Sequence, residues 1–138
     1  MNYIKDDLFK INISIIAHGA NTSGAIEKII KDRYPDVYKK YRNYFLRNGL
    51  KLGEVIFSSS KDKYIYHLIT QNKHGNDGKT YIDYDAIRKC VTNLNFLCKN
   101  QTIAMSMIGS GLGGGDWNKN SKIIEQELTN VETYVYYI

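Results

Sequence analysis

Two short apolar runs constrain the fold of this chain more than any other feature. They are INISIIA at Ile11–Ala17 and IAMSMI at Ile103–Ile108, and both are rich in β-branched and other apolar residues. Runs of this length are typical of strands that are buried on both faces of a parallel sheet. Each run leads into a segment that contains glycine, which indicates that the chain turns where the strand ends.

Apolar residues recur at helical spacing in other parts of the chain. The predicted helices begin near Ile26, cover Asp36–Asn48, run from Ile87 to Leu97 and begin again after Asp116, which is a good N-cap. Shorter strand patterns lie at Asn2–Lys5, Glu54–Ser58, Tyr64–Thr70 and Val131–Ile138. This order predicts one α/β domain over residues 1–138, in which helices cover both faces of a largely parallel sheet.

The net charge of the 138 residues is +5. A basic balance can indicate a nucleic-acid partner or an anionic ligand. Many of the lysines and arginines are spread along the two helices predicted between residues 26 and 48, which favours a solvated helix face. We therefore expect no nucleic-acid partner, with a nucleic-acid surface as the less favoured alternative.

Several classes of protein are not expected. No apolar run approaches the roughly 20 residues that span a bilayer, and the N-terminus lacks the layout of a signal peptide. We expect a cytoplasmic protein without a membrane partner. Cys90 and Cys98 would lie roughly 12 Å apart on one helix, beyond disulfide reach, so both are expected to be reduced. No metal-ligand spacing is legible, and neither a metal nor a cofactor is expected.

The segment that follows the second apolar run is the most informative part of the chain. It reads Gly109, Ser110, Gly111, Leu112, Gly113, Gly114, Gly115, and five of these seven residues are glycine. Between a buried strand and a helix N-terminus, such a segment exposes backbone N–H groups that can bind a phosphate or diphosphate. The His18–Gly24 segment follows the first run. In a parallel sheet both would lie at the edge where ligands bind.

The order of these pieces resembles the macro domain family over nearly the whole chain. The matching pieces are YIKDDLF, IIAHGANTSG, KDRYPDVYKKYR, LKLGEVIF, YIYHLITQ, TYIDYDAIRKC, SMIGSGLGGGDW and the final VYYI. The resemblance implies a three-layer α/β/α fold with a mixed six-stranded sheet in the order 1-6-5-2-4-3. It also implies that the ligand is ADP-ribose or a derivative of it.

The resemblance implies a role for each of four positions. Asp7 aligns with the acid that accepts from the adenine amino group, and Asn21 with the asparagine that contacts the distal ribose. Gly109–Gly115 aligns with the segment that holds the diphosphate. His18 aligns with a histidine of the ADP-ribose-1''-phosphate phosphatase branch; it could serve as general acid or base there, and His18 and Asn21 together would place the water. The alternative for His18 is a hydrogen-bonded residue that fixes the turn.

Three departures from the family pattern bear on catalysis. Gly24 and Ala25 run directly into Ile26, so the glycine-rich stretch that usually follows the asparagine is shortened. Gln71 and Gly113 stand where the branch that removes ADP-ribose from carboxylates has its lysine and aspartate, and an amide cannot replace a lysine nucleophile. The preferred expectation is a protein that binds ADP-ribose or a derivative and hydrolyses it, as an ADP-ribose-1''-phosphate phosphatase or a related ADP-ribosyl hydrolase. A binding module without catalysis, and an RNA- or poly(ADP-ribose)-binding protein, stay open as alternatives.

Overall fold

The computed structural model describes residues 1–72, 82–109 and 116–138. The described residues form a six-stranded sheet in the order β1-β6-β5-β2-β4-β3, which confirms the predicted order. The helices and strands, in chain order, are β1 (Asn2–Lys5), the 3₁₀ helix η1 (Leu8–Lys10), β2 (Ile15–Asn21), α1 (Lys28–Arg33), α2 (Pro35–Asn48), β3 (Val55–Ser60), β4 (Lys63–Gln71), α3 (Tyr84–Leu97), β5 (Thr102–Ser106), α4 (Trp117–Glu127) and β6 (Glu132–Tyr137).

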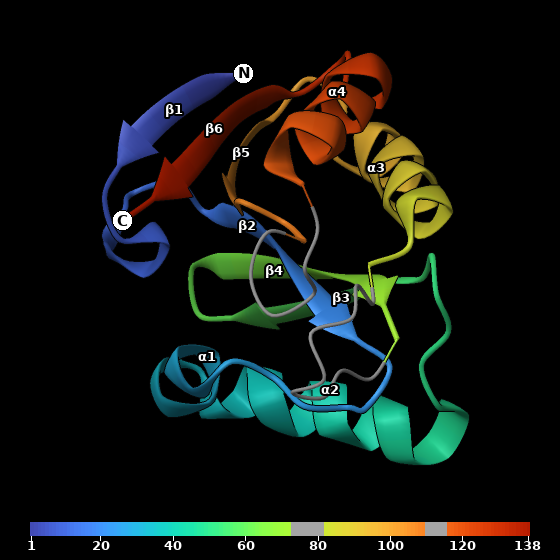
Figure 1. Ribbon diagram of the computed structural model, residues 1–138. Helices are drawn as coiled ribbons and strands as arrows, with labels where there is room; N and C mark the ends of the chain where they lie inside the picture. The colour runs from blue at the N-terminus through green and yellow to red at the C-terminus, as the bar shows by residue number, and fades with distance from the viewer. Residues whose placement is uncertain (73–81, 110–115) are drawn as a thin grey trace.

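The sheet is mixed, and the helices cover both of its faces (Figure 1). The edge strand β3 runs antiparallel to β4, and the remaining neighbours are parallel. Helices α1 and α2 lie on one side of the sheet, and α3 and α4 lie on the other. The three-layer α/β/α architecture expected from the sequence is confirmed.

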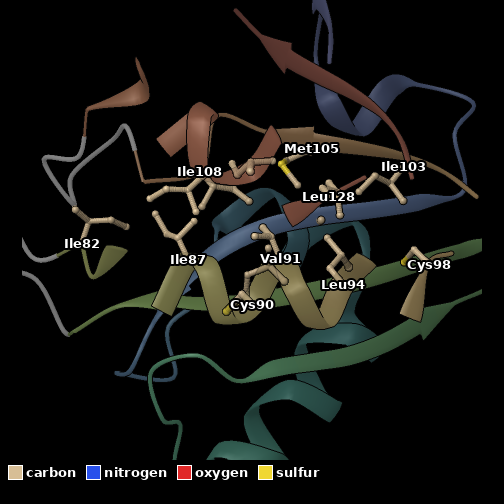
Figure 2. Close-up of a cluster of buried hydrophobic side chains, with 14 residues drawn as sticks. Ile82, Ile87, Cys90, Val91, Leu94, Cys98, Ile103, Met105, Ile108 and Leu128 are labelled. Carbon is tan, nitrogen blue, oxygen red and sulfur yellow. The ribbon is translucent and has the colours of Figure 1, made fainter. Parts of the chain in front are cut away.

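Each face of the sheet packs on its own apolar cluster. On the side of α3 and α4, Val91 and Leu94 point toward the strands and meet Ile103 and Met105 of β5 (Figure 2). On the opposite side, Ile16 of β2 packs with residues of α1 and α2. Burial of apolar side chains on both faces is the main stabilising contribution.

Local capping fixes where the helices begin. Pro35 occupies the first turn of α2, where its missing N–H costs nothing. The Asp83 carboxylate accepts from the backbone N of Ala86 at the start of α3. Asp116 accepts from the backbone N of Asn118, so its predicted role as the N-cap of α4 is confirmed.

The first apolar run does not form a strand where the sequence predicted it. The strand covers Ile15–Asn21 instead of Ile11–Ala17, a shift of four residues at each end. The Lys63 ammonium group donates to the backbone carbonyls of Ile11 and Ile13 at 2.8 and 2.9 Å, so a side chain, and not a neighbouring strand, binds this backbone. As a consequence His18 and Asn21 belong to β2 itself, and not to the turn after it.

Both cysteines are free and buried, as expected from their spacing. Burial raises the pKa of the Cys90 thiol to about 12, which keeps it protonated and unreactive near neutral pH. In the described part of the chain, no helix is long and apolar enough to cross a membrane.

The segment between β2 and α1 is held by close packing at Gly24. Its φ is +80°, and an added Cβ would lie 2.6 Å from the ring of Phe45. Gly49, at the end of α2, has φ +69° but open space around the position of a Cβ. The two glycines therefore share a positive φ and differ in packing.

We expect Gly24→Ala to lower the free energy of unfolding by roughly 2–4 kcal/mol, because the left-handed conformation and the clash both contribute. The control Gly49→Ala should lose less, because only its backbone conformation (φ +69°, ψ 177°) opposes a side chain. Urea denaturation of both variants measures the difference. Equal losses would show that Phe45 moves aside without cost.

Candidate functional site

The candidate site lies at the edge of the sheet where the parallel strands β2, β4 and β5 end. In the parallel pairing of β2 with β4, Asn21 lies opposite Gln71 at the end of both strands. On its other side β2 pairs with β5, which leads through Ile108 to Gly109. Ligands of α/β sheets bind at this kind of edge, where successive connections leave toward opposite faces.

Asn21 begins a tight turn. Its side-chain oxygen accepts from both the backbone N and the hydroxyl of Ser23, and the Ser23 hydroxyl accepts in turn from the backbone N of Ala25 at 3.2 Å. The side-chain oxygen is therefore committed to the turn. Any contact of Asn21 with a ligand falls to its amide nitrogen, which is a donor.

His18 lies beneath this turn and is almost completely buried. Its Nε2 is 2.6 Å from Nδ1 of His67, and its Nδ1 is 3.1 Å from the carbonyl of Gly19. The far nitrogen of His67 is 3.2 Å from the hydroxyl of Ser58. Protein groups thus occupy both nitrogens of both rings, as is usual for buried polar side chains.

Glu27 completes this chain of side chains from the segment that follows β2. Its carboxylate lies 3.6 Å from Nδ1 of His18. The hydrogen bond with His18 lowers the pKa of Glu27, so this group is ionised near neutral pH. Burial, and then the charge of His18, hold the pKa of His67 well below its usual value, so His67 is neutral.

These contacts place His18 away from a direct approach to a ligand. The catalytic role that the resemblance implies for His18 and Asn21 stays a prediction. Both nitrogens of the His18 ring are bonded to protein groups. To exchange a proton with a ligand, the ring would have to pass it through Glu27 or break its present contacts. His67 is fully buried, which agrees with a structural role.

Asp7 lies at the end of β1, where it caps η1. Its carboxylate accepts from the backbone N of Phe9 at 2.9 Å, and the carboxylate of Asp6 accepts from the backbone N of Asp7 at 2.7 Å. A carboxylate has two oxygens, so the cap leaves Asp7 with acceptor capacity for a ligand. The adenine contact itself stays a prediction.

The glycine-rich segment begins from a tightly packed position. Asn120 of α4 is fully buried and donates from Nδ2 to the carbonyl of Ile108 at 2.9 Å. An added Cβ on Gly109 would lie 2.7 Å from the same nitrogen. Asn120 therefore ties the start of the segment to α4. The other expected members, Ser110, Gly111, Leu112, Gly113, Gly114 and Gly115, lie outside the described residues.

Three polar residues of this region were not found by sequence reasoning: Asn120, Thr70 and Glu27. Asn120 and Thr70 are buried, and the Asn120 Oδ1 and Thr70 Oγ1 atoms have no hydrogen-bond partner among the described residues. A polar residue in the apolar stripe of α4 was the available signal for Asn120. Glu27 gave no signal, because its partner lies on a neighbouring strand.

A groove with a volume of about 480 Å³ lies elsewhere, between α2 and the edge strand β3. Its basic residues are Lys39, Lys40 and Arg47, and it contains none of the site residues predicted from the sequence. Within the described ranges, no group of histidine, cysteine and acidic residues could hold a metal ion.

The family model described as Macro domain matches residues 14–124. The chain belongs to the macro domain family. This range contains Asn21, His18 and the glycine-rich segment, so the candidate site falls within the matched part except for Asp7. The resemblance found in the sequence is thereby confirmed.

Known relatives span this macro domain from end to end. A protein of Lodderomyces elongisporus named ADP-ribose 1''-phosphate phosphatase is 26% identical over 159 residues, which cover 100% of this chain and 98% of that protein. The macrodomain of Thermus aquaticus DarG has a TM-score of 0.80 at 21% identity, covering 99% and 97% of the two chains. An Oceanobacillus iheyensis macrodomain mutant with ADPR has a TM-score of 0.77 at 18% identity, covering 99% and 84%. The two structures establish the fold.

The tie between Asn120 and the Ile108 carbonyl predicts a specific loss of stability. Asn120→Ala should lower the free energy of unfolding by roughly 1–3 kcal/mol, because it leaves a buried carbonyl unpaired. The exposed Asn118→Ala on the same helix should change it by no more than about 0.5 kcal/mol. Chemical denaturation of both variants checks this. Similar stability of the two would mean that water replaces the amide.

Proposed function

We propose that this macro domain binds ADP-ribose or a close derivative at the carboxyl edge of its sheet. The observation that carries the proposal is that Asn21 ends β2 and Gly109 follows the adjacent parallel strand β5, so that both residues belong to the same edge of the sheet. Membership of the macro domain family, and a related fold solved with ADPR, support this choice of ligand.

Each part of the ligand has a residue of suitable chemistry. Gly109–Gly115 would supply backbone donors to the diphosphate, helped by the N-terminus of α4, which is a helix of 11 residues. The Asn21 amide would donate to a ribose hydroxyl. Asp7 would accept from the adenine amino group. The net charge of +5 favours an anionic ligand of this kind.

The adenine contact can be tested without loss of the η1 cap. Asp7→Asn keeps one oxygen for the backbone N of Phe9 but presents an NH₂ donor where adenine also donates. We expect ADP-ribose binding to weaken by roughly 1–3 kcal/mol in calorimetry, the cost of an unpaired buried partner. The variant should also reverse the preference of the parent for ADP-ribose over its inosine analogue, because the inosine base has a carbonyl in place of the amino group and this carbonyl can accept from the new NH₂ group.

Asp6→Asn is the matched control for Asp7→Asn. It changes the neighbouring carboxylate and keeps an oxygen that can accept from the backbone N of Asp7. Affinity and base preference should stay those of the parent protein. If Asp7→Asn behaves like Asp6→Asn, the adenine group binds elsewhere.

A second candidate function is hydrolysis of ADP-ribose-1''-phosphate. It is favoured by the relative named ADP-ribose 1''-phosphate phosphatase, which is similar over the whole chain. Removal of ADP-ribose from glutamate is disfavoured, because Gln71 cannot supply the amine nucleophile that the deacylating branch uses. The phosphatase reaction instead requires a group that activates water.

The turnover of ADP-ribose-1''-phosphate by His18→Ala, compared with the parent, tells whether His18 is catalytic or only supports the turn. General acid–base catalysis by His18 would make the loss 10²–10⁴-fold, the typical contribution. We expect the loss to stay under about 10-fold and to come with a lower melting temperature, because the His18 ring is buried and bonded on both sides. A loss in the larger range with an unchanged melting temperature would make His18 the catalytic group.

A further inference from the structure

Four side chains from different segments form a continuous polar chain under the candidate site. They are Ser58 of β3, His67 of β4, His18 of β2 and Glu27, which precedes α1. The pair of histidines lies in the interior, where burying polar groups is costly unless they are bonded. The Tyr41 ring packs on His67 at 4.5 Å between ring centres and shields the pair from the α2 side.

The hydrogen-bond geometry determines where protons lie. His18 Nδ1 faces two acceptors, the Gly19 carbonyl and the Glu27 carboxylate, so this nitrogen carries a proton. When both rings are neutral, His67 donates to His18 Nε2 and accepts from Ser58. When His18 is charged, it donates to His67, and His67 donates to Ser58 in its other tautomer. The four side chains therefore take up a proton without losing a hydrogen bond.

An added proton stays on His18 and not on His67. His18 has a carboxylate 3.6 Å from its ring, whereas His67 faces a neutral hydroxyl and the ring of Tyr41. Arg42 of α2 also contacts this segment: it donates to the carbonyl of Gly24 at 3.4 Å and packs over the ring of Phe45. Charging His18 strengthens its contact with Glu27 and leaves the other contacts as they are.

The contact with Glu27 holds the end of a short segment whose beginning is part of the ligand site. Residues 22–27 start at the Asn21 turn and pack on Phe45 at Gly24. Glu27 is the last residue before α1, and its side chain crosses back to β2. Both ends of the segment are therefore fixed to the same strand, three residues apart at His18 and Asn21.

We propose that Glu27 and His67 act through His18 as positioning residues for residues 22–27. They hold this segment in the shape that binds ADP-ribose, and they hold it more firmly when His18 is protonated. This inference rests on the proposed function, because it assigns the segment to the ADP-ribose site. It predicts a higher affinity for ADP-ribose at low pH, where His18 is charged, than at high pH, where it is neutral.

The test is calorimetric titration with ADP-ribose between about pH 6 and pH 8.5, where neither its diphosphate nor its adenine changes charge. Affinity of the parent protein should fall about 3- to 10-fold across this range, a modest change because Glu27 is half exposed and water screens the pair. Glu27→Gln should bind at every pH about as weakly as the parent at high pH. Ser58→Ala, which leaves both histidines in place, should keep part of the slope.

Asp32→Asn is the matched control, because it removes a carboxylate from the neighbouring helix α1 that pairs with Lys28 and not with His18. It should keep the slope of the parent. A Glu27→Gln variant with the parent's slope would overturn the proposal, and so would a parent affinity that does not change with pH.

Amide hydrogen exchange of residues 22–27 without ligand separates the two proposals. Exchange should be faster in Glu27→Gln than in Asp32→Asn at pH 6 and equal in the two at pH 8.5. If the parent does not bind ADP-ribose but Glu27→Gln exchanges faster than Asp32→Asn only at pH 6, the proposed ligand is wrong. The role of Glu27 and His18 in holding residues 22–27 is then still supported. If the two variants exchange equally at both pH values, Glu27 does not hold residues 22–27.

Discussion

The pairing of β2 on both of its edges is the constraint on which the rest of the structure depends. β2 bonds to β4 over seven residue pairs and to β5 over three. This register sets His18 beside His67 and Asn21 beside Gln71. It also brings the end of β2 next to the strand that leads to Gly109. A shift of β2 by one residue would turn His18 toward the opposite face of the sheet and dismantle the site.

Several polar groups inside the apolar layers support segments at the carboxyl edge of the sheet. The histidine pair lies under residues 22–27, and Asn120 holds the carbonyl of Ile108 before the glycine-rich segment. Each such group costs free energy on burial and recovers it only when it is bonded. An apolar core of the same volume would stabilise the sheet but would leave both segments without side-chain anchors. The buried polar groups therefore cost free energy but hold the two segments in position.

Residues 22–27 are shorter and poorer in glycine than the family pattern, and side-chain contacts hold this segment in place. The stretch that the resemblance leads one to expect there would rely on backbone flexibility and several exposed N–H groups. This chain instead uses side chains: Asn21 fixes the turn, Gly24 packs on Phe45, and Glu27 reaches His18. Side-chain anchors leave this segment with fewer free backbone donors, so under the proposed function the diphosphate would depend more on the second segment, Gly109–Gly115.

The sequence by itself determined the α/β class, the strand order through the family resemblance, and the cap at Asp116, because periodicity and capping are local properties of the chain. It misplaced β2 by four residues, since apolar residues at Ile11 and Ile13 look the same whether a strand or Lys63 binds their carbonyls. It also could not pair His18 with His67 and Glu27, or Asn120 with Ile108. Those contacts join residues on separate elements, and only the register of β2 and the packing of α4 bring them within bonding distance.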